Sequence, residues 1–448
     1  MKFGFTRIFG SSASLVLAVG LLASLFVPAE AQSETVLPQY SKNIHLGVTS
    51  CAGSTCHGAT TPWPGSTVLQ TEYVTWSQKD AHAKAYSVLH NDASKRIAAN
   101  LGLKNAHEAD ICLDCHADNV ASNKRSRVFQ LSDGVGCEAC HGGAQSWLGL
   151  HVSGIASHAD NVKAGMFPTE DPVKRAELCL SCHFGNDKKF VTHKIMGAGH
   201  PRISFELDTF TAIQPAHFEI DDDYRKRKHV ANGIQTWAIG QAMALERRLD
   251  AMLDPKTGQD GIFPELVFFD CQACHHSLTE PRWQPRPSTG LGPGVVRFDD
   301  SNLLMLRIIT SALDPDMGRM LGEKTKKLHE ASQVSMQDFH TAAKDLKNAT
   351  KDMVKIFAAH KFGKADVTTL LKGLVQEAAA AEYSDYAGAE QAVMAISAVL
   401  DAAAKMGMKS ESDAAQGQLD VAFKALQKYD DWDHEALKRA IVSLKIPE

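Results

Sequence analysis

Apolar residues recur with the period of an α-helix along most of the last third of the chain. From about residue 300 onward the sequence contains no cysteine, is rich in alanine and places apolar residues three and four positions apart. Helices of this length predict a small helical bundle. Its histidines, expected at the surface or at helix ends, are His329, His340, His360 and His434. The stretches that show the spacing most clearly are 346–357, 367–374, 393–400, 419–426 and 437–444.

The same period predicts two helices earlier in the chain. One covers 232–253 and ends before Pro255. The other covers 76–89 and brings His82 and Tyr86, four residues apart, onto one face.

A stretch rich in proline and glycine, 281–293, indicates a linker. We therefore expect two domains, one at 32–298 and the other at 299–448, with the helical bundle in the second.

The first 31 residues have the features of a secretory signal. Lys2 and Arg7 precede an apolar run of 15 residues, 13–27, and Ala29-Glu30-Ala31 fits a cleavage site. The alternative is an uncleaved membrane anchor, since 9–29 carries no charge and almost reaches the length that crosses a bilayer. With cleavage at 1–31 we expect a periplasmic or otherwise extracytoplasmic protein.

The composition changes this picture only through two residue types. Hydrophobic residues make up 44% and charged residues 22%, which excludes a polytopic membrane protein, a coiled coil and a largely disordered chain. A net charge of −5 gives no indication of a nucleic-acid partner. The informative counts are ten cysteines and twenty histidines in 448 residues.

The ten cysteines form five close pairs, and a histidine directly follows the second cysteine of every pair. Four of the five motifs read C-x-x-C-H, the attachment signature of c-type haem. Two thiols at this spacing lie on one side of a tight turn and can form thioethers with the two vinyl groups of one porphyrin, while the next imidazole binds the iron. The pairs are Cys51/Cys56, Cys112/Cys115, Cys137/Cys140, Cys179/Cys182 and Cys271/Cys274, and the expected proximal ligands are His57, His116, His141, His183 and His275.

Other uses of paired cysteines explain this pattern less well. A disulfide framework has no reason to place histidine after every second cysteine. Zinc sites use C-x-x-C, but their fourth ligand does not usually follow at once. Thioredoxin-like motifs do not occur five times in one chain. The first motif, CAGSTCH, has four intervening residues, yet it stands beside four standard motifs and leaves no cysteine unpaired. We therefore expect five covalently bound haem c groups, each with its iron.

Three segments resemble the cytochrome c-554-like family of multihaem cytochromes. Residues 76–85 (WSQKDAHAKA) look like its W-x-x-S-x-HA-x-A element with one or two residues inserted, and 134–142 (GVGCEACHG) is similar to V-x-CE-x-CHG. Residues 199–207 (GHPRISFEL) resemble a GHP-x-x-x-FEL segment of relatives. The likeness covers about 45–300. It implies a mainly α fold: a multihaem cytochrome c domain with little regular sheet, here followed by the C-terminal helical bundle.

The resemblance also implies distal ligands. His82 is expected to bind a haem attached further along the chain, and His151, downstream of the CE-x-CHG motif, another. His193 and His200 flank the GHP segment within reach of the fourth and fifth motifs, and His45 lies six residues before the first motif. These five are the distal candidates among eleven non-proximal histidines of the haem-bearing region.

Relatives include electron carriers and enzymes that act on small nitrogen and sulfur compounds. One haem of the type family lacks a distal ligand, and the second motif, with His116, occupies the corresponding place here. No C-x-x-C-K motif is present, so the lysine-ligated active haem of pentahaem nitrite reductases is absent. We expect an electron-transfer protein whose haems are mostly bis-histidine. The alternative is an oxidoreductase acting on such a compound at one five-coordinate haem.

The expected partners are redox proteins, either other cytochromes or a quinol-linked donor at a membrane. A further alternative makes the C-terminal bundle a docking or assembly module to which the haem domain supplies electrons.

Overall fold

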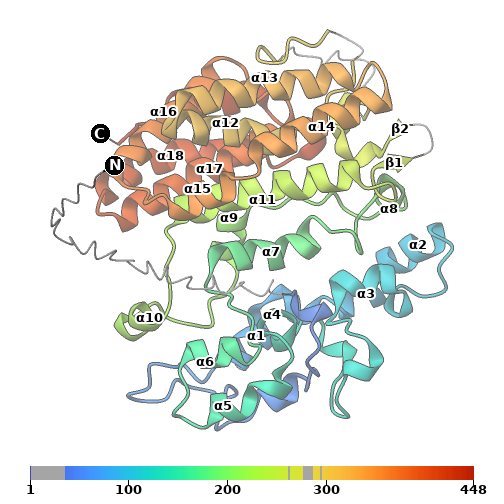
Figure 1. Cartoon of the computed structure of the whole chain (residues 1–448), viewed down its shortest axis with the longest axis vertical. Helices are drawn as coiled ribbons and strands as arrows, with labels where there is room; N and C mark the ends of the chain where they lie inside the picture. The colour runs from blue at the N-terminus through green and yellow to red at the C-terminus, as the bar shows by residue number, and fades with distance from the viewer. Residues whose placement is uncertain (2–35, 261–262, 276–285, 293–294, 448) are drawn as a thin grey trace. The chain divides into compact units, whose positions relative to one another are not determined.

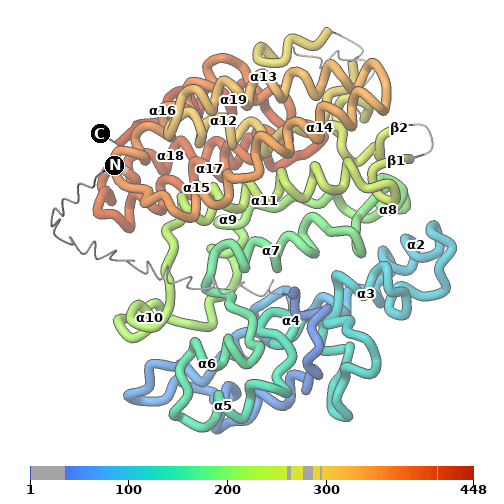
Figure 2. Tube along the Cα trace, in the orientation of Figure 1, coloured from blue at the N-terminus to red at the C-terminus, as the bar shows by residue number. Residues whose placement is uncertain are grey.

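The computed structural model describes Met1 and residues 36–260, 263–275, 286–292 and 295–447 (Figure 1 and Figure 2). The expected signal segment lies outside the described residues apart from Met1, as do residues 281–285 and 293 of the expected linker at 281–293. Residues 36–448 form one compact unit.

The first half of this unit consists of short helices joined by turns and extended chain. Three of the helices end on the histidine of a cysteine motif, namely α3, α4 and α7. The residue after each leaves helical geometry; Gly142, for example, has φ 82°. The helices are α1 (Glu72–Lys79), α2 (Asp92–Asn100), α3 (Asp110–His116), α4 (Cys137–His141), α5 (Leu148–Val152), α6 (His158–Lys163), α7 (Pro172–His183), α8 (His193–Gly197), α9 (Leu207–Ile213) and α10 (Asp222–Arg227).

The second half contains longer helices that pack on one another. Its helices are α11 (Gly233–Leu253), α12 (Ser301–Leu313), α13 (Pro315–Ala331), α14 (Met336–Thr350), α15 (Met353–Ala359), α16 (Lys364–Ala379), α17 (Tyr386–Lys405), α18 (Lys409–Ala425) and α19 (His434–Val442). Among the described residues the only strands are the two-residue β1 (Gln259–Asp260) and β2 (Phe263–Pro264), which pair antiparallel. The expected mainly α fold is confirmed.

Helix α11 is the element that joins the two halves. It contacts α7 and α9 on one side and α12, α14, α15 and α17 on the other (Figure 1). The predicted helix at 232–253 is thus confirmed, and the side chain of Asn232 caps it by accepting from the Gln235 amide. Most of its residues are buried around the whole circumference, including Trp237 and Gln241, as expected of a helix inside a protein.

Two other predicted helices are divided. The stretch 76–89 is not one helix, because α1 ends at Lys79 and Asp80 is extended. Its carboxylate accepts from the His82 amide and so starts a separate 3-10 turn, Ala81–Lys84. The stretch 346–357 is divided between α14 and α15: the Thr350 hydroxyl donates back to the Leu346 carbonyl, a bond that bends helices.

One continuous hydrophobic core runs from Ala176 and Leu180 on α7, through α11, to Leu444 near the chain end. It crosses the expected domain boundary near 298, which stays a prediction. Before Ala176 the largest apolar cluster has only five buried members, Leu89, Ala98, Ala106, Leu113 and Ala117. The region that carries the first three cysteine motifs therefore has little hydrophobic core of its own.

Several charged groups are buried where the segment around 286–300 meets α17. The Arg286 guanidinium pairs with Asp300 and Asp385, and all three side chains are almost fully inaccessible. His329, expected at the surface or a helix end, is only 1% exposed: its Nδ1 bonds the Thr325 carbonyl and it faces Asp300. In the part of the chain that the structure describes, no helix is long and apolar enough to cross a membrane.

Candidate haem-binding sites

Three of the cysteine motifs fold so that both thiols and the imidazole lie on one face of a helix. In α3, α4 and α7 the three residues follow helical spacing. The first and fifth motifs lie outside α-helices but close the same cysteine-to-histidine turn. The His275 amide bonds the Cys271 carbonyl at 2.8 Å, and the His57 amide bonds the Cys51 carbonyl at 3.1 Å although two more residues intervene.

Cys56 and Cys274, the second cysteines of the first and fifth motifs, differ in local geometry from the second cysteines of the three helical motifs. The Cys56 amide bonds the Gly53 carbonyl at 2.8 Å and the Cys274 amide bonds the Cys271 carbonyl at 3.3 Å, so each lies in a three-residue turn rather than in a helix. Cys274 is exposed, and the half-buried Cys56 lies beside the Thr55 hydroxyl at 3.9 Å. Haem attachment stays a prediction from the motifs at all ten cysteines, Cys56 and Cys274 included.

All ten cysteines lie in the described residues and are free thiols there. Thiols of different motifs lie next to each other: Cys51 is beside Cys137, and Cys115 is beside Cys182. The first motif is therefore next to the third, and the second next to the fourth.

Every motif histidine faces a second histidine across a gap of nearly constant width. The ring centroids lie 5.9 Å apart for His57 and His151, 6.1 Å for His183 and His82, 6.4 Å for His116 and His200, 6.2 Å for His141 and His217, and 6.2 Å for His275 and His193. A metal–imidazole bond is about 2 Å, so two imidazoles on opposite sides of one iron put their centroids about 6 Å apart. The gaps match the width that an iron bound to both rings requires.

Hydrogen bonds at Nδ1 leave Nε2 for a metal in several of these rings. His57 Nδ1 bonds Glu72 and His82 Nδ1 bonds Asp80, both at 2.9 Å. His116 Nδ1 bonds the Ala85 carbonyl at 3.0 Å, and His200 Nδ1 bonds the Pro201 carbonyl at 2.8 Å. Partners of this kind orient a ligating imidazole and determine its tautomer.

Burial keeps other rings in the neutral form that binds metals. It lowers the pKa of His141 to about 3 and that of His183 to about 4, the second ring also lying against Phe205. A neutral imidazole is the ligating form.

Four of the five distal candidates face a motif histidine: His82, His151, His193 and His200. His45 does not, which differs from expectation. It is fully buried, with Nδ1 on Asp118 at 2.7 Å and Nε2 on the Pro38 carbonyl at 3.3 Å, so both nitrogens are engaged.

His217 lies where a fifth distal ligand is needed, opposite His141. It is one of eleven non-proximal histidines in the haem-bearing region, and no local spacing distinguishes it. His116, placed by the resemblance at the position of an open iron, faces His200.

The residues fit haem c. No group of three or more cysteine, histidine, aspartate or glutamate residues in the described part of the chain could hold a bare metal ion. Each facing pair would supply two imidazoles to one haem iron, and the two thiols beside it would hold the porphyrin. This donor set defines a c-type cytochrome.

The comparisons agree with this class. Residues 50–142, which include the first three motifs, match the family described as cytochrome c554 and c-prime. This segment is similar to that family, and the match supports a c-type cytochrome. Neither the curated proteins nor the solved structures gave a match.

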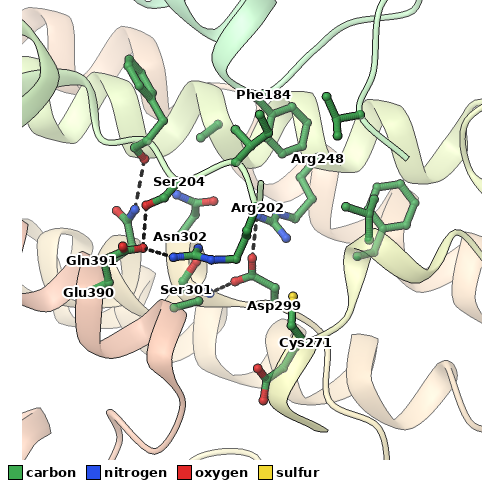
Figure 3. A pocket seen from close by; sticks show the side chains of 18 of the residues that line it. Phe184, Arg202, Ser204, Arg248, Cys271, Asp299, Ser301, Asn302, Glu390 and Gln391 are labelled. Carbon is green, nitrogen blue, oxygen red and sulfur yellow. Dashed lines mark hydrogen bonds and ion pairs between the residues drawn. The ribbon is translucent and has the colours of Figure 1, made fainter. Parts of the chain in front are cut away.

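One cavity adjoins the fifth motif and is lined by elements of both halves of the chain. Cys271, Phe184, Arg202 and Arg248 reach it from the haem-bearing region, and Glu390 from α17 (Figure 3). Arg248 pairs there with Asp299 at 3.1 Å. His183 also lines this cavity, so it lies between the fourth and fifth motifs.

Proposed function

We propose that this protein is an exported pentahaem c-type cytochrome that transfers electrons along closely packed bis-histidine haems. The observation that carries the proposal is the set of five facing histidine pairs, one for each cysteine motif, at 5.9–6.4 Å between centroids. An electron carrier needs coordinatively saturated irons, whereas an enzyme needs at least one iron with a vacant position.

The ten cysteines would hold the porphyrins and the five pairs would hold the irons. Haem supplies one-electron oxidation and reduction when it is bound. The chain's own residues determine the potentials. Histidine pairs lack the thioether ligand that raises potential in His/Met cytochromes, so low potentials are expected. Carboxylates on Nδ1, such as Glu72 on His57 and Asp80 on His82, make those imidazoles stronger donors than a backbone carbonyl does.

The order of neighbours supports transfer between haems. Thiol contacts bring the first motif to the third and the second to the fourth. The cavity shared by His183 and Cys271 brings the fourth to the fifth. Electrons therefore have short routes between motifs that are distant in sequence.

We expect periplasmic or otherwise extracytoplasmic localisation and protein redox partners, among them other cytochromes or a quinol-linked donor at a membrane. The basic residues of α10, Arg225, Lys226 and Arg227, are exposed and available to a partner. A solvated surface without a specific partner is the alternative for this run.

The test is spectroscopic. A pyridine haemochrome assay should give five haems per chain, and the reduced protein should bind no CO. Two ring pairs are near parallel, at 18° and 32°, and three near perpendicular, at 87°, 78° and 88°. Near-perpendicular imidazoles give strongly anisotropic low-spin EPR signals and near-parallel ones give rhombic signals. Two classes in a 3:2 ratio are therefore expected. A high-spin signal worth one haem, with matching CO binding, would overturn the carrier in favour of an open-site enzyme.

A further inference from the structure

The segment that carries His200 is held by a helix of the C-terminal half. Residues 202–205 run along α17, which is remote in sequence and carries no haem motif. His200 itself has no covalent tether. Its partner His116, by contrast, directly follows Cys115. The place of the His200 ring therefore depends on how the chain around it is anchored.

Glu390 on α17 is the main anchor. Its Oε2 accepts from the Arg202 guanidinium at 2.8 Å and from the Ser204 hydroxyl at 2.5 Å (Figure 3). The Arg202 and Glu390 side chains are only 26% and 21% exposed, so the charges are shielded from water and their pairing is stronger than that of a surface pair.

Other contacts keep this anchor rigid. The Arg202 guanidinium lies over the rings of Tyr386 and Tyr429, at 5.3 and 5.4 Å from their centroids. Beside Glu390, the Gln391 amide donates to the Phe205 carbonyl at 3.0 Å. Gln391 is itself bonded to Gln241 of α11 at 2.7 Å. The grip on 202–205 is thus part of the packing of α11 against α17.

Only a short connection separates the anchor from the ligand. Gly199, just before His200, has φ 116°, and the Ala198 carbonyl accepts from Asn100 of α2 at 3.0 Å. His200 thus lies between a hold on α2 and a hold on α17, two residues from Arg202.

We propose that Glu390 is a positioning residue for His200, so that α17 keeps the sixth ligand on the iron bound by His116. The inference rests on the proposed bis-histidine function. Of the five facing pairs, this one depends on α17 through the residues next to its distal ligand. Loss of the Glu390 contacts frees Arg202 and Ser204 and lets His200 move away, which leaves that iron five-coordinate.

The experiment compares Glu390→Ala, His200→Ala and the unaltered full-length holoprotein. We expect Glu390→Ala to gain high-spin EPR intensity and CO binding equal to most of one haem, as His200→Ala does in full. Free imidazole should restore the low-spin spectrum of both variants. Asp401→Asn, an exposed change on the same helix whose carboxylate pairs with Lys405, is the matched control and should gain none.

Two milder variants allow the test to be made even if Glu390→Ala does not fold. Glu390→Gln keeps an oxygen acceptor but loses the charge, and Ser204→Ala removes one hydroxyl; each should open a smaller fraction of the same haem. The inference is overturned if Glu390→Ala carries its full haem content and binds no more CO than the unaltered protein. If Glu390→Ala does not fold, the same result in Glu390→Gln and Ser204→Ala overturns it.

The proposed function fails separately, if the unaltered protein itself binds CO. The inference is then judged by how much more CO each variant binds than the unaltered protein. It survives if His200→Ala and Glu390→Ala each open a further haem, and it is overturned if neither does.

Discussion

The region before α7 and the region after it are built in different ways. From α11 to α19 long helices bury apolar faces against one another in one continuous core. Before α7 the helices are short, and the described apolar cluster has five small or medium members. What the first region has in abundance is ligand chemistry, with three of the five motifs and the distal His82 and His151. The contrast indicates that porphyrins take the place of a protein core in one region and are peripheral to stability in the other.

The largest effect should come from withholding haem. Full-length protein made without cytochrome maturation should lose the structure of α3 and α4, because neither has a large core to rest on, while α12 and α17 stay folded. Hydrogen exchange resolved by peptide measures this, with near-complete loss of protection in the first region. Equal protection of α4 and α17 in the haem-free chain would contradict the contrast.

The C-terminal region should be sensitive to its buried charges. Arg286→Met removes the main partner of the buried Asp300 and Asp385 and leaves them His329 at 3.7 Å and Arg297 at 3.4 Å, which costs about 3–5 kcal/mol of unfolding free energy. Urea unfolding followed by far-UV circular dichroism measures the loss. Arg319→Met is the matched control, since the Arg319–Asp316 pair is exposed and should be silent. If Arg286→Met left the free energy of unfolding unchanged, packing alone would hold this region.

A buried carboxylate has the corresponding role in the first region. Glu138, inside the third motif and 2% exposed, accepts from the amides of Leu46, Gly47 and Ala144 at 2.6–2.7 Å. Glu138→Gln turns one acceptor into a donor that faces donors, at a cost of about 2 kcal/mol. Thermal loss of the low-spin haem absorption should shift down, while the melting of α-helical signal from the second region stays in place. A shift of both together would mean that the regions unfold as one.

A smaller effect is expected at Lys189, which lies between the second and fourth motifs. The residue is 8% exposed, and its ammonium contacts the Cys182 sulfur at 3.1 Å, the Asp114 carbonyl at 2.8 Å and the Gln39 side-chain oxygen at 2.8 Å. A positive charge there favours the reduced haem. Lys189→Met should lower one or two potentials by on the order of tens of millivolts. Potentiometric titration measures this, and Lys188→Met, on the exposed neighbour, is the control.

The smallest effect concerns pH and the contact of α9 with its neighbours. Burial, followed by the carboxylates of Glu206 and Asp401, raises the pKa of Asp208 to about 8. The cations Lys405 and Arg175 act in the opposite direction and lower it. A raised carboxyl pKa favours folding below about pH 4 and loses that contribution as pH rises to about 8. Asp208→Asn should therefore flatten the decline in stability between these values in denaturant titrations. Asp92→Asn, on an exposed carboxylate of α2, should leave the slope unchanged.

Much of the helical part could be predicted because its pattern is local. The 232–253 period matches α11, and Pro255 follows its end. The prediction of a continuous helix was wrong at 76–89 and 346–357, where a side chain competes with the helix for hydrogen bonds. Asp80 caps a new turn, and Thr350 bonds back to its own helix. Burial of His329 could not be predicted, since it depends on Asp300, a residue from another element.

The burial of the individual thiols could not be predicted from a local sequence pattern either. The motif around Cys274 reads like the one around Cys182, yet Cys274 is exposed on a turn while Cys182 lies in α7 against Lys189. Cys56 has two more residues before it than the other second cysteines and lies outside any helix. Spacing along the chain therefore identifies a thiol, whereas the elements packed around it determine how well it is covered.

The sequence by itself identified the cysteines and the adjacent histidine of each candidate site. Cysteine, cysteine and histidine at fixed spacing close one turn whatever surrounds them, so the attachment residues and proximal ligands can be identified from local geometry. Only the tertiary structure decided which histidine completes each pair. It placed His217 opposite His141, turned His45 toward Asp118, and brought Glu390 to the segment of His200. The facing histidines come from other elements, and the packing of those elements, above all α11 against α17, is a property of the whole fold.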